Sequence, residues 1–491
     1  MKVYTSLKLQ RITTVIAVIL SILTAACTEQ TADNRQPMPS WYEAFERFEG
    51  VNLPQLEPEE DFKTFIHHPQ FVQNLTAMGW NTFRLPVDWE SYAEDNGDLK
   101  PELVATGREN LKALVAVLAQ IYRQNHKPIF LIIDIHQYKF GSVCGGVGIP
   151  SKAIRTTGLD KEDPNCVFRA FDRFWKNDRN VLAKWAGFAR EILKETPEIF
   201  EENKEWLTLG FEPINEPQFG FGSAVFDETS MYNTFMNLRE ATSTEVVQRQ
   251  IDNYLVPFYR RFLNMLHTIP NMDKVLEKSL MVFEPYFLDH IMLEVPVRLH
   301  ANLPEFNVSI STDGSYVGML DLRKIPGTSK DVYWIAAPHH YIGALDNGFL
   351  SYVPSHFRRL LTRYPNNVID AARIDMRMFW LKNRMAEAGM DTLIGEWGTE
   401  TGLLQTNGSS GGYRTWITDS LASIGRYSKG ALWWRYYRDA SAGQEQMYLL
   451  TNKGIERGDT MAPNGPQNLK CGEGYDLVRL VFGHCGEARG L

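Results

Sequence analysis

Two short stretches each place a glutamate directly after an apolar run. In Leu207–Gln218, alternating apolar residues lead to Asn215 and Glu216, and the following proline prevents further strand pairing. In Asp391–Gly398, Glu396 follows a short apolar run and lies between glycines that let the backbone turn. If both strands belong to one parallel barrel, the two carboxyl groups meet at its carboxyl-terminal mouth. There they can act on a single bond, one as an acid and one as a nucleophile.

Other polar residues stand at the ends of apolar runs before these two. Arg84 lies among apolar neighbours in Trp80–Val87. Because a buried arginine must be paired, we expect it either to keep a catalytic carboxylate ionised or to form a structural ion pair. Asp134 and His136 lie two residues apart at the end of Ile129–Gln137 and therefore share one face of a strand.

The later part of the sequence repeats this arrangement. Glu284 ends the run Leu280–Pro285, and we expect it to line a cleft rather than to catalyse. The run Tyr333–Tyr341 ends in His339, His340 and Tyr341. In Gly430–Tyr437, Trp434 is expected at the mouth, whereas its neighbour Trp433 points to the other face of the strand and into the core.

The elements that must position these residues alternate along the chain. Strands are predicted at residues 48–52, 80–87, 129–137, 207–216, 280–285, 333–341, 391–398 and 430–437, with helices near 62–78, 108–124, 181–193, 246–267 and 371–388. This alternation predicts an α/β fold, a (β/α)8 TIM barrel whose strand ends gather polar residues at one mouth. The long segment 138–177 is expected to shape a cleft there.

The amino terminus has the pattern of an export signal. Lys2, Lys8 and Arg11 precede the apolar run Val15–Leu23, which is too short to span a membrane. The sequence Leu-Thr-Ala-Ala-Cys27 resembles a bacterial lipobox, with an ordinary cleaved signal and an incidental cysteine as the alternative.

We therefore predict a lipoprotein signal peptide at 1–26, lipid attachment at Cys27, a tether at 27–45, and one catalytic domain at 46–491 that includes a carboxyl-terminal extension. The expected location is the bacterial cell envelope, with a lipid anchor in the outer membrane favoured over a periplasmic or secreted form.

Composition narrows the class of partner. The formal charge is −8 and falls to about −11 without the signal, so nucleic acid is not expected as a partner. Aromatic residues make up 12% of the chain, and their rings suit the apolar faces of sugars. Four cysteines besides Cys27 allow three disulfide connectivities, of which Cys144–Cys166 with Cys471–Cys485 is the sequence-local choice.

Together these motifs resemble the retaining β-glycosidases of glycoside hydrolase family 5. The resemblance covers residues from about 50 to 439 and rests on Arg84 in Asn-Thr-Phe-Arg-Leu-Pro, His136 in Asp-Ile-His-Gln, Asn215 and Glu216 in Asn-Glu-Pro, His339 and Tyr341 in His-His-Tyr, Glu396 in Gly-Glu-Trp-Gly, and Trp434 in Leu-Trp-Trp-Arg.

The resemblance implies a role for each of these residues. Glu216 would be the general acid/base and Glu396 the nucleophile, kept ionised by Arg84. Asn215 would bond the sugar 2-hydroxyl, and Trp434 would lie under the reacting sugar. His339 and Tyr341 would orient the carboxylates, with His136 as a further supporting residue. No cofactor and no metal are expected, and the chain is expected to act as a monomer on a β-linked glycan or glycolipid.

Within the family, Asp-Ile-His-Gln followed by a long loop and Ala170–Asn177 resembles the endoglycoceramidase-related branch. Two features depart from that branch: Tyr138 stands where it usually has an aspartate, and only about fifty residues follow the eighth strand, too few for an appended β-sandwich. A β-linked oligosaccharide, polysaccharide or glycoconjugate is therefore the expected substrate, with glycolipid hydrolysis as the alternative.

Two further classes are considered. A metal-dependent barrel hydrolase could use Asp134, His136, His339 and His340, but such barrels place a His-x-His on the first strand, where this chain has Gly50-Val-Asn52. A surface lipoprotein that binds glycans without cleaving them would not need both Glu216 and Glu396.

Overall fold

The fold was examined in a computed structural model of the chain. It describes residues 39–58, 79–163, 166–218, 248–285, 332–341, 371–398, 410–434, 437–438 and 450–451, together with isolated positions between 62 and 76 and Gly220. The predicted signal peptide, Cys27 and the Cys471–Cys485 pair lie outside the described residues, as do the bounds of the helix predicted at 62–78.

Ten of the described strands form one parallel sheet that closes into a barrel. Its strands are β1 (Phe48–Asn52), β2 (Thr82–Asp88), β3 (Ile129–His136), β4 (Leu207–Glu212), β5 (Ser279–Phe283), β6 (Tyr333–Ala336), β7 (His340–Tyr341), β8 (Asp391–Thr392), β9 (Ile394–Gly398) and β10 (Gly430–Trp433). Their order is β7-β9-β10-β1-β2-β3-β4-β5-β6-β8.

The barrel closes through the segment 391–398, which pairs with the strands on both sides of it. Its first part, β8, pairs with β6, and its second part, β9, pairs with β10 and β7, with only Leu393 between the two parts. Likewise, β6 and β7 are two parts of the strand predicted at 333–341. Counted by chain segment, the sheet is the predicted eight-stranded (β/α)8 barrel, which is confirmed.

Prolines explain why two predicted strands are shorter or broken. β4 ends at Glu212 because Pro213 has no N–H to donate to the ladder, and the break between β6 and β7 contains Pro338. The predicted eighth strand ends at Trp433 rather than Tyr437. Beyond it, β11 (Tyr437–Arg438) pairs instead with β12 (Leu450–Thr451).

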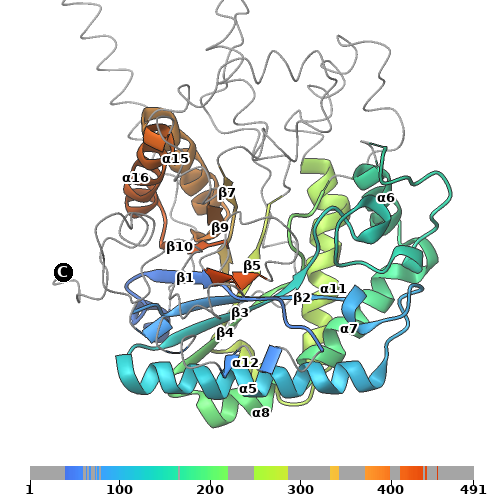
Figure 1. Cartoon of the computed structure of the whole chain (residues 1–491), viewed down its shortest axis with the longest axis horizontal. Helices are drawn as coiled ribbons and strands as arrows, with labels where there is room; N and C mark the ends of the chain where they lie inside the picture. The colour runs from blue at the N-terminus through green and yellow to red at the C-terminus, as the bar shows by residue number, and fades with distance from the viewer. Residues whose placement is uncertain are drawn as a thin grey trace, which may run out of the picture.

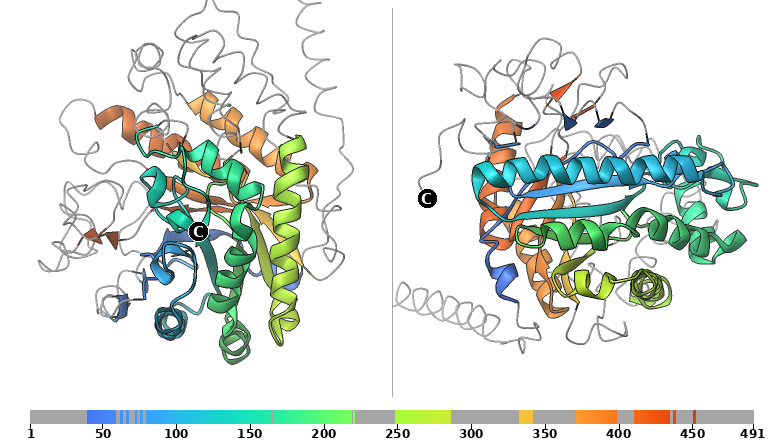
Figure 2. Two further views of the ribbon diagram at one scale, coloured as in Figure 1. Left: turned by 90° about the vertical axis from the view of Figure 1, so that its right-hand side faces the viewer. Right: turned by 90° about the horizontal axis from the view of Figure 1, so that it is seen from below.

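Helices surround the strands (Figures 1 and 2). The described ones are α2 (Ser40–Glu43), α5 (Pro101–Asn125), α6 (Cys166–Trp175), α7 (Val181–Leu193), α8 (Thr196–Asn203), α11 (Val256–His267), α12 (Met272–Leu276), α15 (Ala371–Glu387) and α16 (Ser410–Tyr427). α5 begins seven residues before the predicted start, with Pro101 in its first turn. A π-helical turn at Ile251–Leu255 precedes α11.

The barrel interior is apolar towards its amino-terminal end. Phe48, Phe130 and Leu280 share an inner cluster with Tyr42 and Phe45, and both of the latter are buried. The Phe45 ring stacks on Phe48 at 5.2 Å between ring centroids. The last residues of the predicted tether therefore pack into the barrel and close this end. A second, larger cluster fills the space between strands and helices.

The long segment after β3 is fastened to the fold by a disulfide. Cys144 and Cys166 are bonded, with their Cα atoms 5.6 Å apart, so this predicted pair is confirmed. The bond joins a short 3-10 turn at Ser142–Cys144 to the start of α6. None of the described helices is long and apolar enough to cross a membrane.

Candidate active site

Arg84 lies at the centre of the barrel mouth and bonds to five side chains. It is fully buried on β2. Nε and Nη2 donate to the two carboxyl oxygens of Glu212, at 2.6 and 3.0 Å. Nη1 donates to Glu396 Oε1 at 2.6 Å and to Asn52 Oδ1 at 2.9 Å. The predicted proximity of Arg84 to Glu396 is therefore present.

The remaining Nη2 contacts complete the pairing of this guanidinium. Nη2 donates to Asn215 Oδ1 at 2.7 Å and lies 3.0 Å from Asp134 Oδ2. Burial disfavours the charge, but the negative charges of Asp134, Glu212 and Glu396 outweigh burial and hold the pKa of Arg84 well above its usual value. Arg84 is therefore a fixed positive charge.

The turn after β4 aims the Glu216 side chain. Glu216 has a φ of 40°, a left-handed conformation that is unfavourable for a residue with a side chain. Gln137 Nε2 donates to the main-chain oxygens of Asn215 and Glu216, at 2.5 and 2.9 Å, and Asn215 Nδ2 donates to Gln137 O at 2.8 Å. The turn is thus held in place by Gln137, the residue that follows β3.

His339 lies between the two glutamates that the sequence singles out. Its Nδ1 is 2.9 Å from Glu216 Oε1 and 3.3 Å from Glu396 Oε2. A carboxyl oxygen of Glu216 and one of Glu396 lie within 4.8 Å of each other and of this ring. The geometry therefore brings both carboxyl groups to one point at the barrel mouth.

The two carboxyl groups have different surroundings. Burial, followed by the negative charge of Glu396, raises the pKa of Glu216 well above its usual value, although Arg84 lowers it. Glu396 instead accepts a direct hydrogen bond from Arg84. Glu216 is therefore suited to hold a proton at neutral pH, and Glu396 is paired with a cation.

His136 and Trp434 lie beside this centre. The two rings are stacked, with centroids 5.5 Å apart and planes 15° apart, and Trp434 is half-buried. His136 Nδ1 is 2.7 Å from Asp134 Oδ2. Burial raises the pKa of Asp134 to about 7, even though Arg84 lowers it. Trp433 is buried against Trp397, as predicted.

Not every predicted residue is brought to this centre. His340 Nε2 lies 3.0 Å from Ser420 Oγ on α16, so its side chain leaves the group proposed for a metal-dependent hydrolase. Only the main chain of Tyr341 is described, as part of β7. Glu284, which is expected to line a cleft, is fully buried and contacts the Glu216 main chain and the His339 ring.

Sequence reasoning missed Glu212 and Gln137. Glu212 forms the two-point ion pair with Arg84, and Gln137 holds the turn of Glu216. A signal for Glu212 was available, because a carboxylate at the end of an otherwise apolar buried strand requires a cationic partner. Gln137 acts through contacts distant in sequence and carries no local signal.

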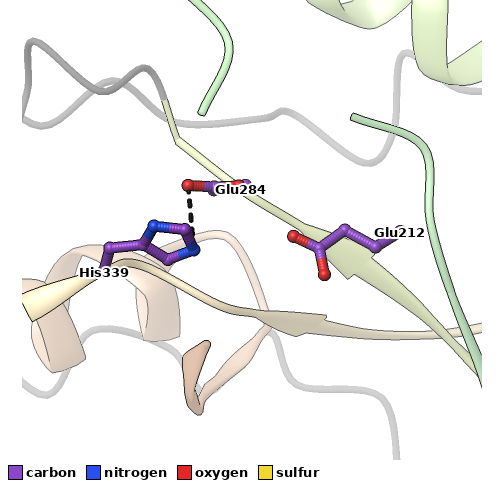
Figure 3. Close-up of side chains that lie close together, drawn as sticks. All are labelled: Glu212, Glu284 and His339. Carbon is purple, nitrogen blue, oxygen red and sulfur yellow. Dashed lines mark ion pairs between the residues drawn. The ribbon is translucent and has the colours of Figure 1, made fainter. Parts of the chain in front are cut away.

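Among the described residues, two groups of buried side chains have donor atoms close enough for a metal ion: Glu212, Glu284 and His339, and Glu216, His339 and Glu396. Figure 3 shows the first group, in which Glu284 faces His339. Both oxygens of Glu212 already accept hydrogen bonds from Arg84. One oxygen of Glu284 accepts the Glu216 N–H, at 2.7 Å. The first group is thus engaged in a hydrogen-bond network.

A closed α/β barrel with an acid and a cation-paired carboxylate at its mouth has the form of a glycoside hydrolase. Residues 43–255 match the family model Cellulase (glycosyl hydrolase family 5). The match includes Arg84, His136 and Glu216. It ends before Glu396, so it spans the first part of the region over which the motifs resemble the family.

Solved structures with a similar course of the chain include three glycosidases. Endo-glycoceramidase II from Rhodococcus sp. is 17% identical, with a TM-score of 0.46, over 79% of this chain and 72% of that chain. An endogalactoceramidase is 14% identical, with a TM-score of 0.48, over 84% and 74%. A broad-specificity endoglucanase from Ruminococcus flavefaciens is 12% identical, with a TM-score of 0.46, over 91% and 97%. No curated protein sequence matches the chain significantly.

Proposed function

We propose that this protein is a retaining β-glycosidase in which Glu396 is the nucleophile and Glu216 the general acid/base. The observation that carries the proposal is the pair of carboxyl groups whose oxygens lie within 4.8 Å, only one of which bonds to Arg84. Retaining glycosidases need their two carboxyl groups about 5–5.5 Å apart, because the nucleophile attacks the sugar directly.

The reaction would proceed in two displacements. Glu396 attacks the anomeric carbon while Glu216 gives its proton to the departing oxygen, which leaves a glycosyl ester on Glu396. Glu216, now ionised, takes a proton from water, and the water attacks the same carbon and releases Glu396. Two inversions give net retention, and the steps need no cofactor.

Neighbouring side chains support this chemistry. Asn215 accepts from Arg84 and donates one Nδ2 hydrogen to Gln137, so its second Nδ2 hydrogen can bond the sugar 2-hydroxyl. His339, which faces both carboxyl groups, orients them, and Tyr341 is proposed to assist it. The Trp434 ring, supported by the stacked His136, provides a surface under the reacting sugar.

The stereochemistry of the first product tests this function. Hydrolysis of an aryl β-glycoside is followed by proton NMR before mutarotation equalises the anomers. The β-anomer should form first. Initial formation of the α-anomer would show inversion and contradict a nucleophilic Glu396.

The substrate class is proposed as a β-linked oligosaccharide, polysaccharide or glycoconjugate. The Ala170–Asn177 sequence and the motif around His136 favour a glycolipid as the alternative. Glucan and mannan oligosaccharides, aryl β-glycosides and glycosphingolipids should be offered in parallel, with products identified by mass. Cleavage of glycosphingolipids alone would select the alternative.

The proposed location is the cell envelope of a bacterium, with the protein exported and lipid-anchored through Cys27 as a monomer. The basis is the charged and apolar pattern of residues 1–26 and the residues preceding Cys27. Cys27→Ala should release the protein from the membrane fraction and keep its activity. Retention of that variant in the membrane fraction would contradict lipid attachment.

A further inference from the structure

Glu284 occupies a position that the proposed reaction does not explain. It follows β5 and is fully buried, yet it contacts both the main chain of Glu216 and the ring of His339. Glu284 Oε2 accepts the Glu216 N–H at 2.7 Å, and Oε1 lies 3.2 Å from His339 Nε2 (Figure 3). The other nitrogen of the same ring faces the Glu216 carboxyl group.

The charge balance of the mouth determines the protonation state of Glu284. Asp134, Glu212 and Glu396 contact Arg84, whereas Glu284 is not among the ion-pair partners of that guanidinium in the described structure. Burial, then the negative charges of Glu212 and Glu216, raises the pKa of Glu284 well above its usual value. Carboxyl oxygens of Glu212 and Glu284 also lie within 4.8 Å of each other, and a proton on Glu284 would relieve the repulsion between two negative charges there.

We propose that Glu284 is a positioning residue for the acid/base, a neutral carboxyl group that holds both the Glu216 main chain and the His339 ring. The proposal rests on the role proposed for Glu216. By accepting the Glu216 N–H, Glu284 helps to retain a left-handed turn that a glutamate would otherwise avoid. Its Oε1 lies 3.2 Å from His339 Nε2, so a proton on Nε2 would point to Glu284 and leave the opposite nitrogen of the ring to face Glu216.

Several elements hold Glu284 in this place. Its own N–H donates to Tyr259 Oη on α11 at 3.1 Å, and its carboxyl group meets Glu212 at the end of β4. The groups that face Glu216 are His339, Glu396 from β9, Glu284, and the more distant charges of Arg84 and Asp134. A change at Glu284 therefore reaches Glu216 through its backbone and through His339.

The effect on leaving groups separates positioning from general damage. An acid matters greatly for a poor leaving group and little for a good one. Glu284→Leu, which accepts no hydrogen bond, should lose about 10²-fold more kcat/KM, which reports formation of the glycosyl ester, on an alkyl β-glycoside than on a dinitrophenyl β-glycoside. Equal losses on both substrates, or no loss, would overturn the proposal.

Glu284→Gln gives a second test, which can still be made if the leucine variant does not fold. Glutamine is neutral and its oxygen can still accept the Glu216 N–H, but its NH2 group cannot accept from His339 Nε2. The ring should then carry its proton on Nδ1 and donate to Glu216, which lowers the pKa of that acid. The alkaline limb of kcat/KM for the alkyl glycoside should move to lower pH by about half a unit or more. An unmoved limb would overturn the proposal.

Matched variants separate this inference from the proposed function. Asp88→Asn removes another buried carboxyl group from a strand end, one that bonds to Ser91, and should leave the limb in place. Glu216→Ala must itself show the leaving-group-selective loss. If it does and Glu284→Leu does not, the positioning role fails and the function stands. If Glu216→Ala loses equally on both substrates, the proposed acid/base and the inference fail together.

Discussion

The two sides of the barrel mouth carry the same kind of side chain in opposite electrical surroundings. On one side, Glu212 and Glu396 bond directly to Arg84. On the other side, Glu216 and Glu284 face His339 and not the guanidinium, and burial raises the pKa of each well above its usual value. One buried cation thus divides the carboxyl groups at the mouth into those that bond to it and those that face His339 without bonding to it.

The largest effect is expected when the carboxyl group of Glu396 or of Glu216 is replaced by an amide. Glu396→Gln and Glu216→Gln should each fold as the parent does, because both side chains lie at the barrel mouth rather than in the apolar core. Each should lower kcat on a natural glycoside by about 10³-fold or more. Circular dichroism and steady-state kinetics check this, and near-normal turnover by either variant would refute its assignment.

The second prediction concerns a variant that removes the electrostatic difference between the two sides of the mouth. Arg84→Met leaves Asp134, Glu212 and Glu396 buried without their cation. The free energy of unfolding should fall by about 3–5 kcal/mol, the usual cost of removing one partner from a buried ion pair. Activity should fall by about 10²–10³-fold because Glu396 loses the cation that bonds to it.

An exposed arginine provides the control for that variant. Arg155 pairs with Asp178 but is largely exposed. Arg155→Met should change the free energy of unfolding by less than about 1 kcal/mol. Urea unfolding measures both variants, and equal losses for Arg84→Met and Arg155→Met would show that burial of the Arg84 pairs contributes nothing.

The smallest effect concerns a carboxyl group outside the Arg84 network. Asp88 is buried at the end of β2, and burial raises its pKa to about 7 although bonds from Ser91 lower it. The folded state therefore holds the Asp88 proton more tightly than the unfolded state, whose pKa is near 3.8. Stability due to this proton is complete below the unfolded pKa and is lost as pH rises from about 4 to 7.

Asp88→Asn removes that dependence, since an amide does not titrate in this range. Between pH 4 and 8, the parent should lose more stability than the variant. Thermal unfolding at a series of pH values measures the difference. Parallel curves for the two proteins would contradict a buried, protonated Asp88.

The sequence predicts the barrel well because its signals are local. Apolar runs such as Ile129–His136 are confirmed as buried strands, and helix α7 occupies the predicted residues 181–193. The predicted strand ends at Glu216 and Tyr341 extend past Pro213 and Pro338, where the missing N–H interrupts the ladder. Proline positions were visible in the sequence, so these limits could have been placed more closely.

The electrostatic division of the site could be predicted only in part. Arg84 among apolar neighbours indicated a buried ion pair, and its contact with Glu396 was expected. Glu284 was expected to line a cleft, and the structure buries it against His339 and Glu216, two contacts that the sequence did not indicate. Contacts among β4, β5 and the segment after β6 depend on the closed barrel and have no local sequence signal.

The two sides of the mouth can be compared most directly by azide rescue of alanine variants. Glu216→Ala should still form the glycosyl ester from a dinitrophenyl β-glycoside but should release it slowly, because the base that activates water is missing. Azide needs no base, so it should accelerate turnover and give the β-glycosyl azide after two inversions. With Glu396→Ala, azide should attack the substrate directly and give the α-glycosyl azide. The α product from the Glu216 variant together with the β product from the Glu396 variant would contradict the assignment of nucleophile and acid/base.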